Sequence, residues 1–355
     1  MAGMNVQPSL PIAAPGADPH PYTRLTPDAV LDALAAVGLY GDGRLTALSS
    51  YENRVYLIHL EDPFEGHQAV VAKFYRPGRW SREQILEEHA FAADLMAQDV
   101  PAIGPLRLAG ETLHSAEGFL FSVSPRRGGR APELYDFEVL EWIGRFLARI
   151  HTVGSARPFA ARGALDLQTF AIEPRDWLLA SGMIPPDVEG AWRSAINIAI
   201  DLIAKHVDLT LDTGQKRSKI RLHGDCHPGN ILWTPAEQPG AGPHFVDLDD
   251  ARMGPAVQDL WMLLSGDRGQ QTAQLDALLE GYRQFRDFDT RELALIEPLR
   301  TLRLIHYSAW LARRWRDPIF PINFPWFGSR DYWQGQVDML HEQIEALQSE
   351  PLACY

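Results

Sequence analysis

The first periodic pattern in the chain is LTPDAVLDALAAVGL, where apolar residues are spaced as on one face of a helix. Val30, Leu34 and Val37 recur every three or four residues. Thr26 can cap this helix, and the proline that follows suits its first turn. The pattern predicts a helix that ends before Gly38.

The next segments read as strands around one further helix. NRVYLIHL and AVVAKFY are rich in β-branched and aromatic residues and flank the turn-rich EDPFEGHQ, which predicts an antiparallel hairpin. The segment SREQILEEHAFAADLMAQ begins with Ser81 and Gln84 at the spacing of a capping box, so a helix is expected from there to about Met96. GFLFSVS is a further strand candidate.

Beyond Pro125 the pattern changes to helices joined by short strands. Helical periodicity is present over residues 137–151 and 196–203, and short apolar runs predict strands at Ile220–Leu222, Ile231–Thr234 and Phe245–Leu248. SVSPRRGGR interrupts both periodicities and marks a boundary. We expect an α+β, two-lobed fold: a small antiparallel-sheet lobe over residues 25–124 and a larger, mainly helical lobe over residues 125–355.

Composition limits the possible classes of protein. The chain has 355 residues, a hydrophobic content of 46% and a formal net charge of -13. Such a charge argues against a nucleic-acid groove, which needs clustered cations. The two cysteines, Cys226 and Cys354, form no disulfide framework and suggest a reducing compartment. Residues 1–24 read as a disordered tail without a signal peptide or membrane span, so we expect a cytoplasmic protein, with a monomer favoured.

Candidate chemistry concentrates in LHGDCHPGNILW, residues 222–233. His223, Cys226 and His227 have the side chains of zinc ligands, but no fourth ligand follows at the usual spacing. Cys226 near two histidines is also compatible with a nucleophilic cysteine, although such groups are assembled across a fold rather than along a sequence. Neither alternative uses the aspartate and asparagine of this segment.

A phosphoryl-transfer site uses more of these residues. Asp225 and Asn230 have the interval of the kinase loop H-R-D-x-x-x-x-N, in which the aspartate accepts the substrate proton and the asparagine binds magnesium. The apolar run HFV then leads to Asp247. Magnesium prefers oxygen ligands such as these. The acidic VDLDD suggests a bound cation, with Asp249 as a second possible ligand, or it is a solvated acidic turn.

Lys73 is an unusual residue in the apolar strand AVVAKFY, because a buried ammonium group needs a carboxylate. On the following helix Glu88 falls on the apolar stripe with Ile85, Ala92 and Leu95. We therefore pair Lys73 with Glu88 as nucleotide-binding residues. The alternative is a lysine at a strand edge whose head group reaches water.

These motifs together resemble the kinase-like fold of aminoglycoside and choline phosphotransferases. More closely, SYENRVY, VAKFYRP, QILEEH, LHGDCHPGNILW, FVDLDDAR, GPAVQDLWMLL, IEPLR and NFPW are similar to the bacterial stress response kinase A family. The similarity spans nearly the whole chain after the tail. It implies a cytoplasmic serine/threonine protein kinase that uses ATP and Mg2+ and acts in the stress response.

The resemblance also assigns roles to individual residues. It implies that Asp225 accepts the proton, that Asn230 and Asp247 bind magnesium, with Asp247 also an active-site residue, and that Ser50 contacts the ATP phosphates. The chain lacks the G-x-G-x-x-G, DFG and APE segments of ordinary protein kinases. The turn SSYEN is therefore expected to offer a hydroxyl and backbone N–H groups to the phosphates.

Two further residues are expected to support the catalytic loop. The resemblance implies that Asp259 accepts hydrogen bonds from the loop backbone, although a carboxylate at a helix N-terminus is also favoured by the helix dipole. His223 is expected to orient the backbone rather than bind metal. Arg130, in PRRGGR, is expected to border the acceptor opening.

Three functions are compatible with this set of residues. The expected one is a kinase with ATP and serine- or threonine-containing proteins as partners. A small-molecule kinase acting on an amino alcohol, aminoglycoside or sugar uses the same fold, and the acidic chain suits a cationic acceptor. A nucleotide-binding module without catalysis is disfavoured, because the lysine, both aspartates and the asparagine are all present.

Overall fold

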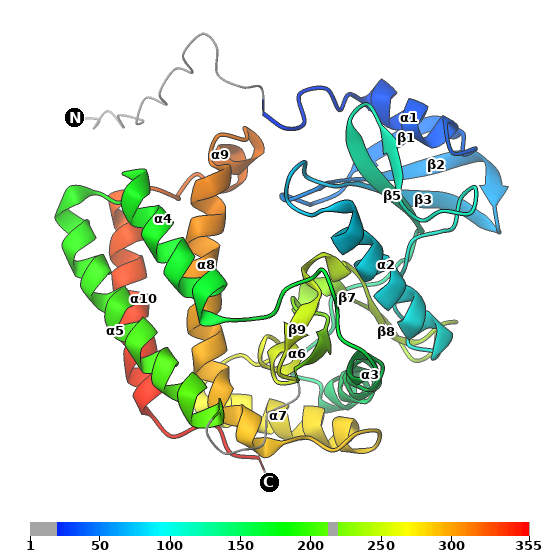
Figure 1. The fold of residues 1–355 in the computed structure, drawn as a ribbon. Helices are drawn as coiled ribbons and strands as arrows, with labels where there is room; N and C mark the ends of the chain where they lie inside the picture. The colour runs from blue at the N-terminus through cyan, green and yellow to red at the C-terminus, as the bar shows by residue number, and fades with distance from the viewer. Residues whose placement is uncertain (1–19, 212–218, 355) are drawn as a thin grey trace, which may run out of the picture.

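The computed structural model describes residues 20–211 and 219–354, which form a sheet-bearing small lobe and a helical large lobe (Figure 1). The predicted α+β, two-lobed architecture is therefore confirmed. Residues 1–19 of the predicted tail lie outside the described residues. Tyr22 is already buried, and its ring stacks on Phe119 with 5.7 Å between centroids. Packed structure thus begins before residue 25.

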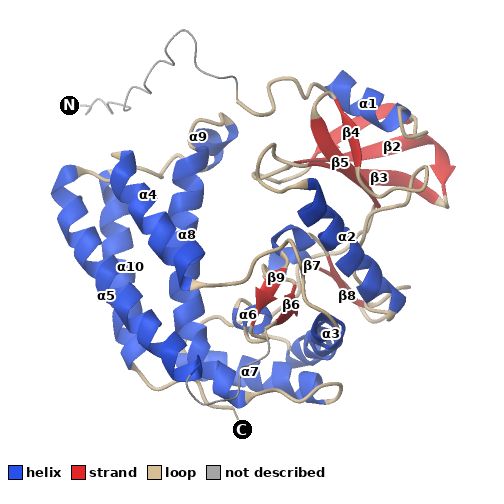
Figure 2. Ribbon diagram, in the orientation of Figure 1, coloured by secondary structure: helices blue, strands red, loops and turns tan. Residues whose placement is uncertain are grey.

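The small lobe contains a five-stranded antiparallel sheet in the order β1-β2-β3-β5-β4 (Figure 2). Alternation along β3 sends Val70, Ala72 and Phe74 into the core, whereas Val71 and Lys73 face the large lobe. The strands are β1 (Gly41–Ala47), β2 (Arg54–Phe64), β3 (His67–Phe74), β4 (His114–Ala116) and β5 (Phe119–Pro125). The face that carries Lys73 therefore borders the space between the lobes.

Two helices accompany the sheet, α1 (Pro27–Ala35) and α2 (Arg82–Ala97). Both predicted starts are confirmed: Thr26 caps α1, and Ser81 and Gln84 form the capping box of α2. Helix α1 packs on the sheet core. Helix α2 instead buries Phe91 and Leu95 in the core of the large lobe. It therefore holds the two lobes together.

The large lobe has two helical layers and two small antiparallel strand pairs. Helices α4, α5, α8 and α10 pack as one group, and α3 packs on α7 (Figure 1). The helices are α3 (Phe137–Ser155), α4 (Glu173–Ser181), α5 (Pro186–Leu211), α6 (Gln258–Trp261), α7 (Arg268–Arg283), α8 (Ile296–Arg314), α9 (Ile319–Asn323) and α10 (Arg330–Gln348). The strand pairs are β6 (Ile220–Leu222) with β9 (Arg252–Gly254), and β7 (Ile231–Thr234) with β8 (Gly242–Phe245). Among the described helices, none has the length and apolar character needed to span a membrane.

One predicted strand is displaced. The strand expected at Phe245–Leu248 is wrong: β8 ends at Phe245, and residues 248–250 form a 3-10 turn. The chain turns because Asp247 adopts a left-handed conformation with φ 58°. Strand β1 was not predicted, because most of its residues are exposed and the segment lacks alternating apolar positions.

Helices α3 and α7 approach so closely that glycine is required at both contact points. A Cβ at Gly144 would lie 2.0 Å from the carbonyl oxygen of Leu278, and a Cβ at Gly281 would lie 2.0 Å from that of Glu141. Both neighbours are helix backbone, which cannot move aside as a flexible side chain can. The packing of α3 against α7 in the large lobe therefore depends on these two glycines.

We expect Gly144→Ala to lower the free energy of unfolding by about 1–3 kcal/mol or more, because overpacking forces the two helices apart. Urea unfolding measures this change. Gly190→Ala in α5 is the matched control: that glycine is exposed, no atom lies within 4 Å of the added Cβ, and alanine should stabilise the helix by up to about 1 kcal/mol. An unchanged stability in Gly144→Ala would contradict the close contact.

Candidate active site

A buried carboxylate, that of Asp259, binds the backbone of the loop after β6. Asp259 accepts hydrogen bonds from the backbone N–H groups of His223 (2.8 Å) and Gly224 (2.9 Å), and His151 donates to the same carboxylate (3.1 Å). Burial alone would raise the pKa of Asp259, but these hydrogen bonds hold it below its usual value. The hydrogen bonds that the resemblance implied for Asp259 are therefore present.

The same loop lies against the segment that carries Asp247. The ring of His223 donates to the carbonyl of Val246 (2.9 Å), so this histidine orients backbone, as expected. Gly224 has φ 86°, and a Cβ there would lie 2.1 Å from the carbonyl oxygen of Asp250. Glycine is required at this position for two reasons, its conformation and the close approach.

Asp225 and Asn230 lie at the two ends of the loop that follows β6. The Asn230 amide nitrogen donates to the backbone carbonyl of Asp225 (2.9 Å), which fixes the amide and leaves its oxygen for a ligand. The Asp225 carboxylate is bound by Arg303 of α8, and the His227 ring is 3.5 Å away. The backbone N–H of Val246 donates to the carbonyl of Asn230 (3.0 Å), which brings Asn230 beside Asp247 as predicted.

Lys73 is surrounded by three carboxylates. Its ammonium nitrogen lies 2.9 Å from Asp247, 2.9 Å from Asp249 and 3.8 Å from Glu88. The predicted pair with Glu88 is thus present, but the two aspartates are closer. Glu88 is buried, as its place on the apolar stripe predicted, and its other oxygen accepts a hydrogen bond from Arg162 (3.0 Å). No signal in the sequence identified Arg162.

Burial and charge shift the pKa values of this cluster in different directions. Burial alone would lower the pKa of Lys73, but the carboxylates of Asp247 and Asp249 outweigh it and hold the pKa well above its usual value. Burial raises the pKa of Glu88 to about 7, against the opposing charge of Lys73. Near neutral pH Glu88 therefore carries its proton part of the time.

Protein cations neutralise most of the acidic VDLDD segment. Asp249 is bound by Lys73 and by Arg79 (2.6 Å), which together outweigh burial and lower its pKa to about 2. Asp250 is bound by Arg79 (2.9 Å) and Arg252 (2.6 Å). The acidic cluster is therefore not by itself a sign of a bound metal, contrary to the expectation from the sequence. The Asp247 side chain, 50% exposed, is the carboxylate of this segment that faces the cleft.

A cleft of about 370 Å³ lies between the lobes and joins these groups. Lys73, Glu88, Asn230 and Asp247 all line it, together with Ser50. Its other walls include apolar side chains from both lobes: Leu48, Val55, Val71, Ile103, Leu232 and Leu248. The arrangement of an apolar wall beside cationic and carboxylate groups suits a nucleotide.

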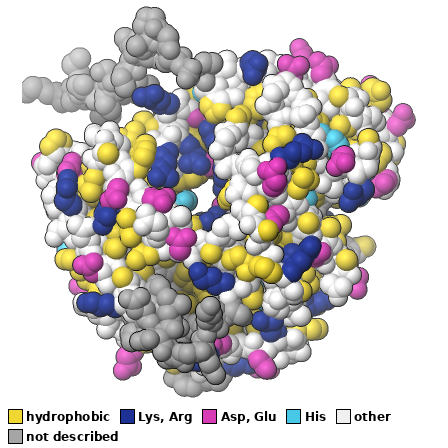
Figure 3. All heavy atoms as spheres, in the orientation of Figure 1, with side chains coloured by type: hydrophobic (Ala, Val, Ile, Leu, Met, Phe, Trp, Pro, Cys, Tyr) yellow, Lys and Arg dark blue, Asp and Glu magenta, His cyan; other side chains and the backbone are white. Residues whose placement is uncertain are grey.

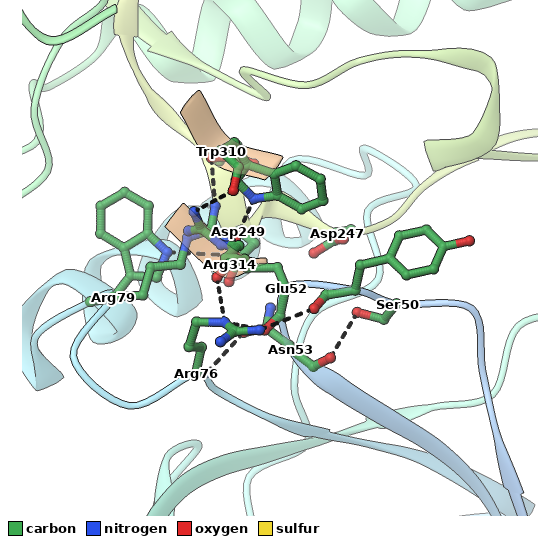
Figure 4. A network of polar contacts seen from close by, with 12 residues as sticks. Ser50, Glu52, Asn53, Arg76, Arg79, Asp247, Asp249, Trp310 and Arg314 are labelled. Carbon is green, nitrogen blue, oxygen red and sulfur yellow. Dashed lines mark hydrogen bonds and ion pairs between the residues drawn. The ribbon is translucent and has the colours of Figure 1, made fainter. Parts of the chain in front are cut away.

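A second network, missed in the sequence, anchors the turn Ser50–Asn53 (Figure 4). Glu52 is buried and binds Arg76 (2.9 Å), Arg314 (2.6 Å) and the indole nitrogen of Trp310 (2.5 Å). Ser50 donates to the carbonyl of Asn53 (3.3 Å). Because Trp310 and Arg314 belong to α8, the turn is held against the large lobe.

The zinc and cysteine-nucleophile alternatives receive no support. In residues 20–211 and 219–354 no group of three or more His, Cys, Asp or Glu side chains is arranged to hold a metal ion. Cys226 is fully buried, and burial raises the pKa of its thiol well above the usual value, the opposite of an activated thiolate.

The known proteins that are similar to this chain are phosphotransferases and kinases. A family model described as "Phosphotransferase enzyme family" matches residues 44–296. Stress response kinase A of Escherichia coli K12 is 46% identical over 333 residues, 93% of this chain and 96% of its own length. "Serine/threonine protein kinase RdoA" of Salmonella typhimurium is 44% identical over 331 residues, again 93% and 96%.

Solved structures share the fold at low sequence identity. The amicoumacin kinase hAmiN, solved with AMP-PNP and Ca2+, has a TM-score of 0.66 at 19% identity and covers 92% of this chain and 95% of its own. A choline kinase from Cryptosporidium parvum has a TM-score of 0.56 at 11% identity, with coverage of 86% and 90%.

The raised pKa of Glu88 makes stability depend on pH. Between about pH 4.5 and 7 the unfolded chain loses this proton while the folded chain keeps it, so the contribution of Glu88 to the free energy of unfolding falls as pH rises through this range. We expect Glu88→Gln to gain stability relative to the unmodified chain across that window, by on the order of 3 kcal/mol. Urea unfolding at several pH values measures the difference, and two parallel curves would contradict it.

Proposed function

The chain is a kinase of the phosphotransferase enzyme family, in the group of stress response kinase A, and from this premise we propose that it transfers the terminal phosphoryl group of ATP to serine and threonine hydroxyls of protein substrates. The proposed reaction depends on Mg2+. Its protein acceptor rests on the relative named as a serine/threonine protein kinase. We propose the cytoplasm, where ATP is available, as its location.

One observation carries the proposal. Lys73, Asn230 and Asp247 come from separate parts of the chain and line one cleft. The Asn230 amide also donates a hydrogen bond to the backbone carbonyl of Asp225. Phosphoryl transfer requires little covalent chemistry from the protein and depends on positioning and charge. A lysine, a proton acceptor and two oxygen ligands are the parts that such a site needs.

The donor set fits magnesium. The Asp247 carboxylate faces the cleft, and the Asn230 amide is oriented with its oxygen available. These two residues would hold the ion, which neutralises phosphate charge when bound. Asp249 is less suited, because Lys73 and Arg79 already occupy its carboxylate.

The remaining residues bind and orient the reactants. Lys73 lies where it can contact the phosphates, and its three carboxylate neighbours hold the ammonium group in place. Ser50 and the backbone of its turn would contact the terminal phosphates. Asp225 accepts the proton of the acceptor hydroxyl. Asp259 and His223 fix the position of the loop that carries Asp225 through their hydrogen bonds to backbone groups. Within this scheme residues 25–124 bind nucleotide and residues 125–355 supply the catalytic groups.

We expect Asp225→Asn to reduce the rate of phosphoryl transfer by about 10²–10⁴-fold, because it removes the proton acceptor. Its affinity for nucleotide should change little. Labelled-ATP transfer to a generic protein substrate and to the kinase itself measures the first quantity, and calorimetry the second. Near-normal turnover in this variant would exclude the role.

Asp247→Ala should behave differently and lose the magnesium-dependent part of ATP binding together with turnover. Calorimetry with and without magnesium separates the two effects. If magnesium tightened ATP binding normally in this variant, the metal ligand would be another residue, with Asp249 the nearest candidate.

A further inference from the structure

A second pocket lies beside Asp225 and shares no residue with the nucleotide cleft. Its volume is about 60 Å³, and it is bordered by Asp225, Asp250, Arg252 and Arg303. A water needs about 10–15 Å³ by this measure, so the pocket has room for several waters or for a group of carboxylate size. Because it adjoins the proposed proton acceptor, it is placed to receive the acceptor substrate.

The charged residues that line this pocket are two aspartates and two arginines. Asp250 is already neutralised by Arg79 and Arg252. Arg303, the second arginine of the lining, is 44% exposed and binds the other carboxylate, that of Asp225. Figure 3 shows both basic and acidic side chains around the central hollow between the helices and the sheet-bearing half. In a protein of net charge -13, the charges that line this pocket are therefore balanced, and Arg303 is the more exposed of its two cations, at 44% against 14% for Arg252.

The histidine of this pocket adds no charge to this balance. His306, one turn after Arg303 on α8, stacks on Phe170 with 4.6 Å between ring centroids, and burial lowers its pKa to about 3. It is therefore neutral at physiological pH and leaves the arginines as the cations of the pocket. Arg130, expected from the sequence to border the acceptor opening, does not line this pocket; it pairs with Glu133 and the backbone of Trp233.

We infer that Arg303 is a specificity-determining residue that binds an anionic group next to the acceptor hydroxyl, and that this binding draws Arg303 away from Asp225. The inference rests on the proposed function and names its substrate class: serine or threonine flanked by acidic residues. A guanidinium has five N–H donors in a fork that matches a carboxylate. Arg303 can thus exchange one carboxylate for another.

This exchange couples substrate recognition to catalysis. In the structure the Asp225 carboxylate is bound by Arg303, which weakens it as an acceptor for a substrate hydroxyl. When the acidic group takes the guanidinium, Asp225 is free to accept the hydroxyl proton as the oxygen attacks the terminal phosphorus and the bond to ADP breaks. A neutral or basic acceptor gives no such release. Amino alcohols and aminoglycosides, which are cations, would meet Arg303 with the wrong charge.

The test uses three peptides that differ only beside the acceptor: Gly-Gly-Glu-Ser-Glu-Gly-Gly and its counterparts with Gln or Lys in place of both Glu residues. We expect the unmodified kinase to favour the acidic peptide over the neutral one by at least about tenfold in kcat/KM, a typical effect of one close charge pair. Arg303→Gln should abolish this preference, and Arg303→Glu should transfer it to the lysine peptide. The affinity for ATP should be unchanged in both variants, which also shows that they are folded.

Arg313→Gln is the matched control, because it removes the same charge from an exposed position of the same helix and does not line the pocket. It should keep the preference for the acidic peptide. Equal use of the three peptides by the unmodified kinase, or an equal loss on all three in Arg303→Gln, overturns the inference and leaves the proposed function standing. If none of the peptides and no protein is labelled while a small hydroxyl compound is, the proposed function itself is overturned.

Discussion

The burial of Asp249 between Lys73 and Arg79 is the constraint from which the geometry of the cleft follows. A buried carboxylate must be neutralised, and removal of one partner from such a pair typically costs about 3–5 kcal/mol. Lys73 comes from β3 and Arg79 from the segment after it, whereas Asp249 follows β8 in the large lobe. This one side chain therefore ties the sheet to the loop that carries Asp247.

Much of the fold was predictable because its signals are local. The caps at Thr26 and Ser81 involve residues three positions apart, so the sequence displays both partners together. The arrangement of Asp225 and Asn230 was likewise readable from a short interval. The displaced strand at Phe245 was not, because the chain turns at Asp247 in a left-handed conformation, next to a hydrogen bond between Val246 and the distant His223.

The polar network around Glu52 illustrates what sequence reasoning misses. Its partners Trp310 and Arg314 lie about 260 positions away in the chain, and each charged residue alone looks like part of a solvated surface. The same holds for Arg303, whose contact with Asp225 spans 78 positions. Pairings of this kind become visible only when the fold brings separate helices and loops together. Local spacing thus pointed to the candidate site residues and to some of their supports, such as Asp259 and Glu88, but not to Arg162, Arg303 or the network around Glu52.

The close approach of Gly224 to the backbone of Asp250 limits how this loop can change. Protein kinases with the H-R-D sequence have arginine at the corresponding place. Here any side chain would collide with a carbonyl oxygen at 2.1 Å and would also require a left-handed backbone. No single substitution can therefore convert one loop into the other, since the strand-linked segment 247–250 would have to move first. A change from one kind of kinase loop to the other therefore requires several substitutions together, and the cause is the close contact between Gly224 and the backbone of Asp250.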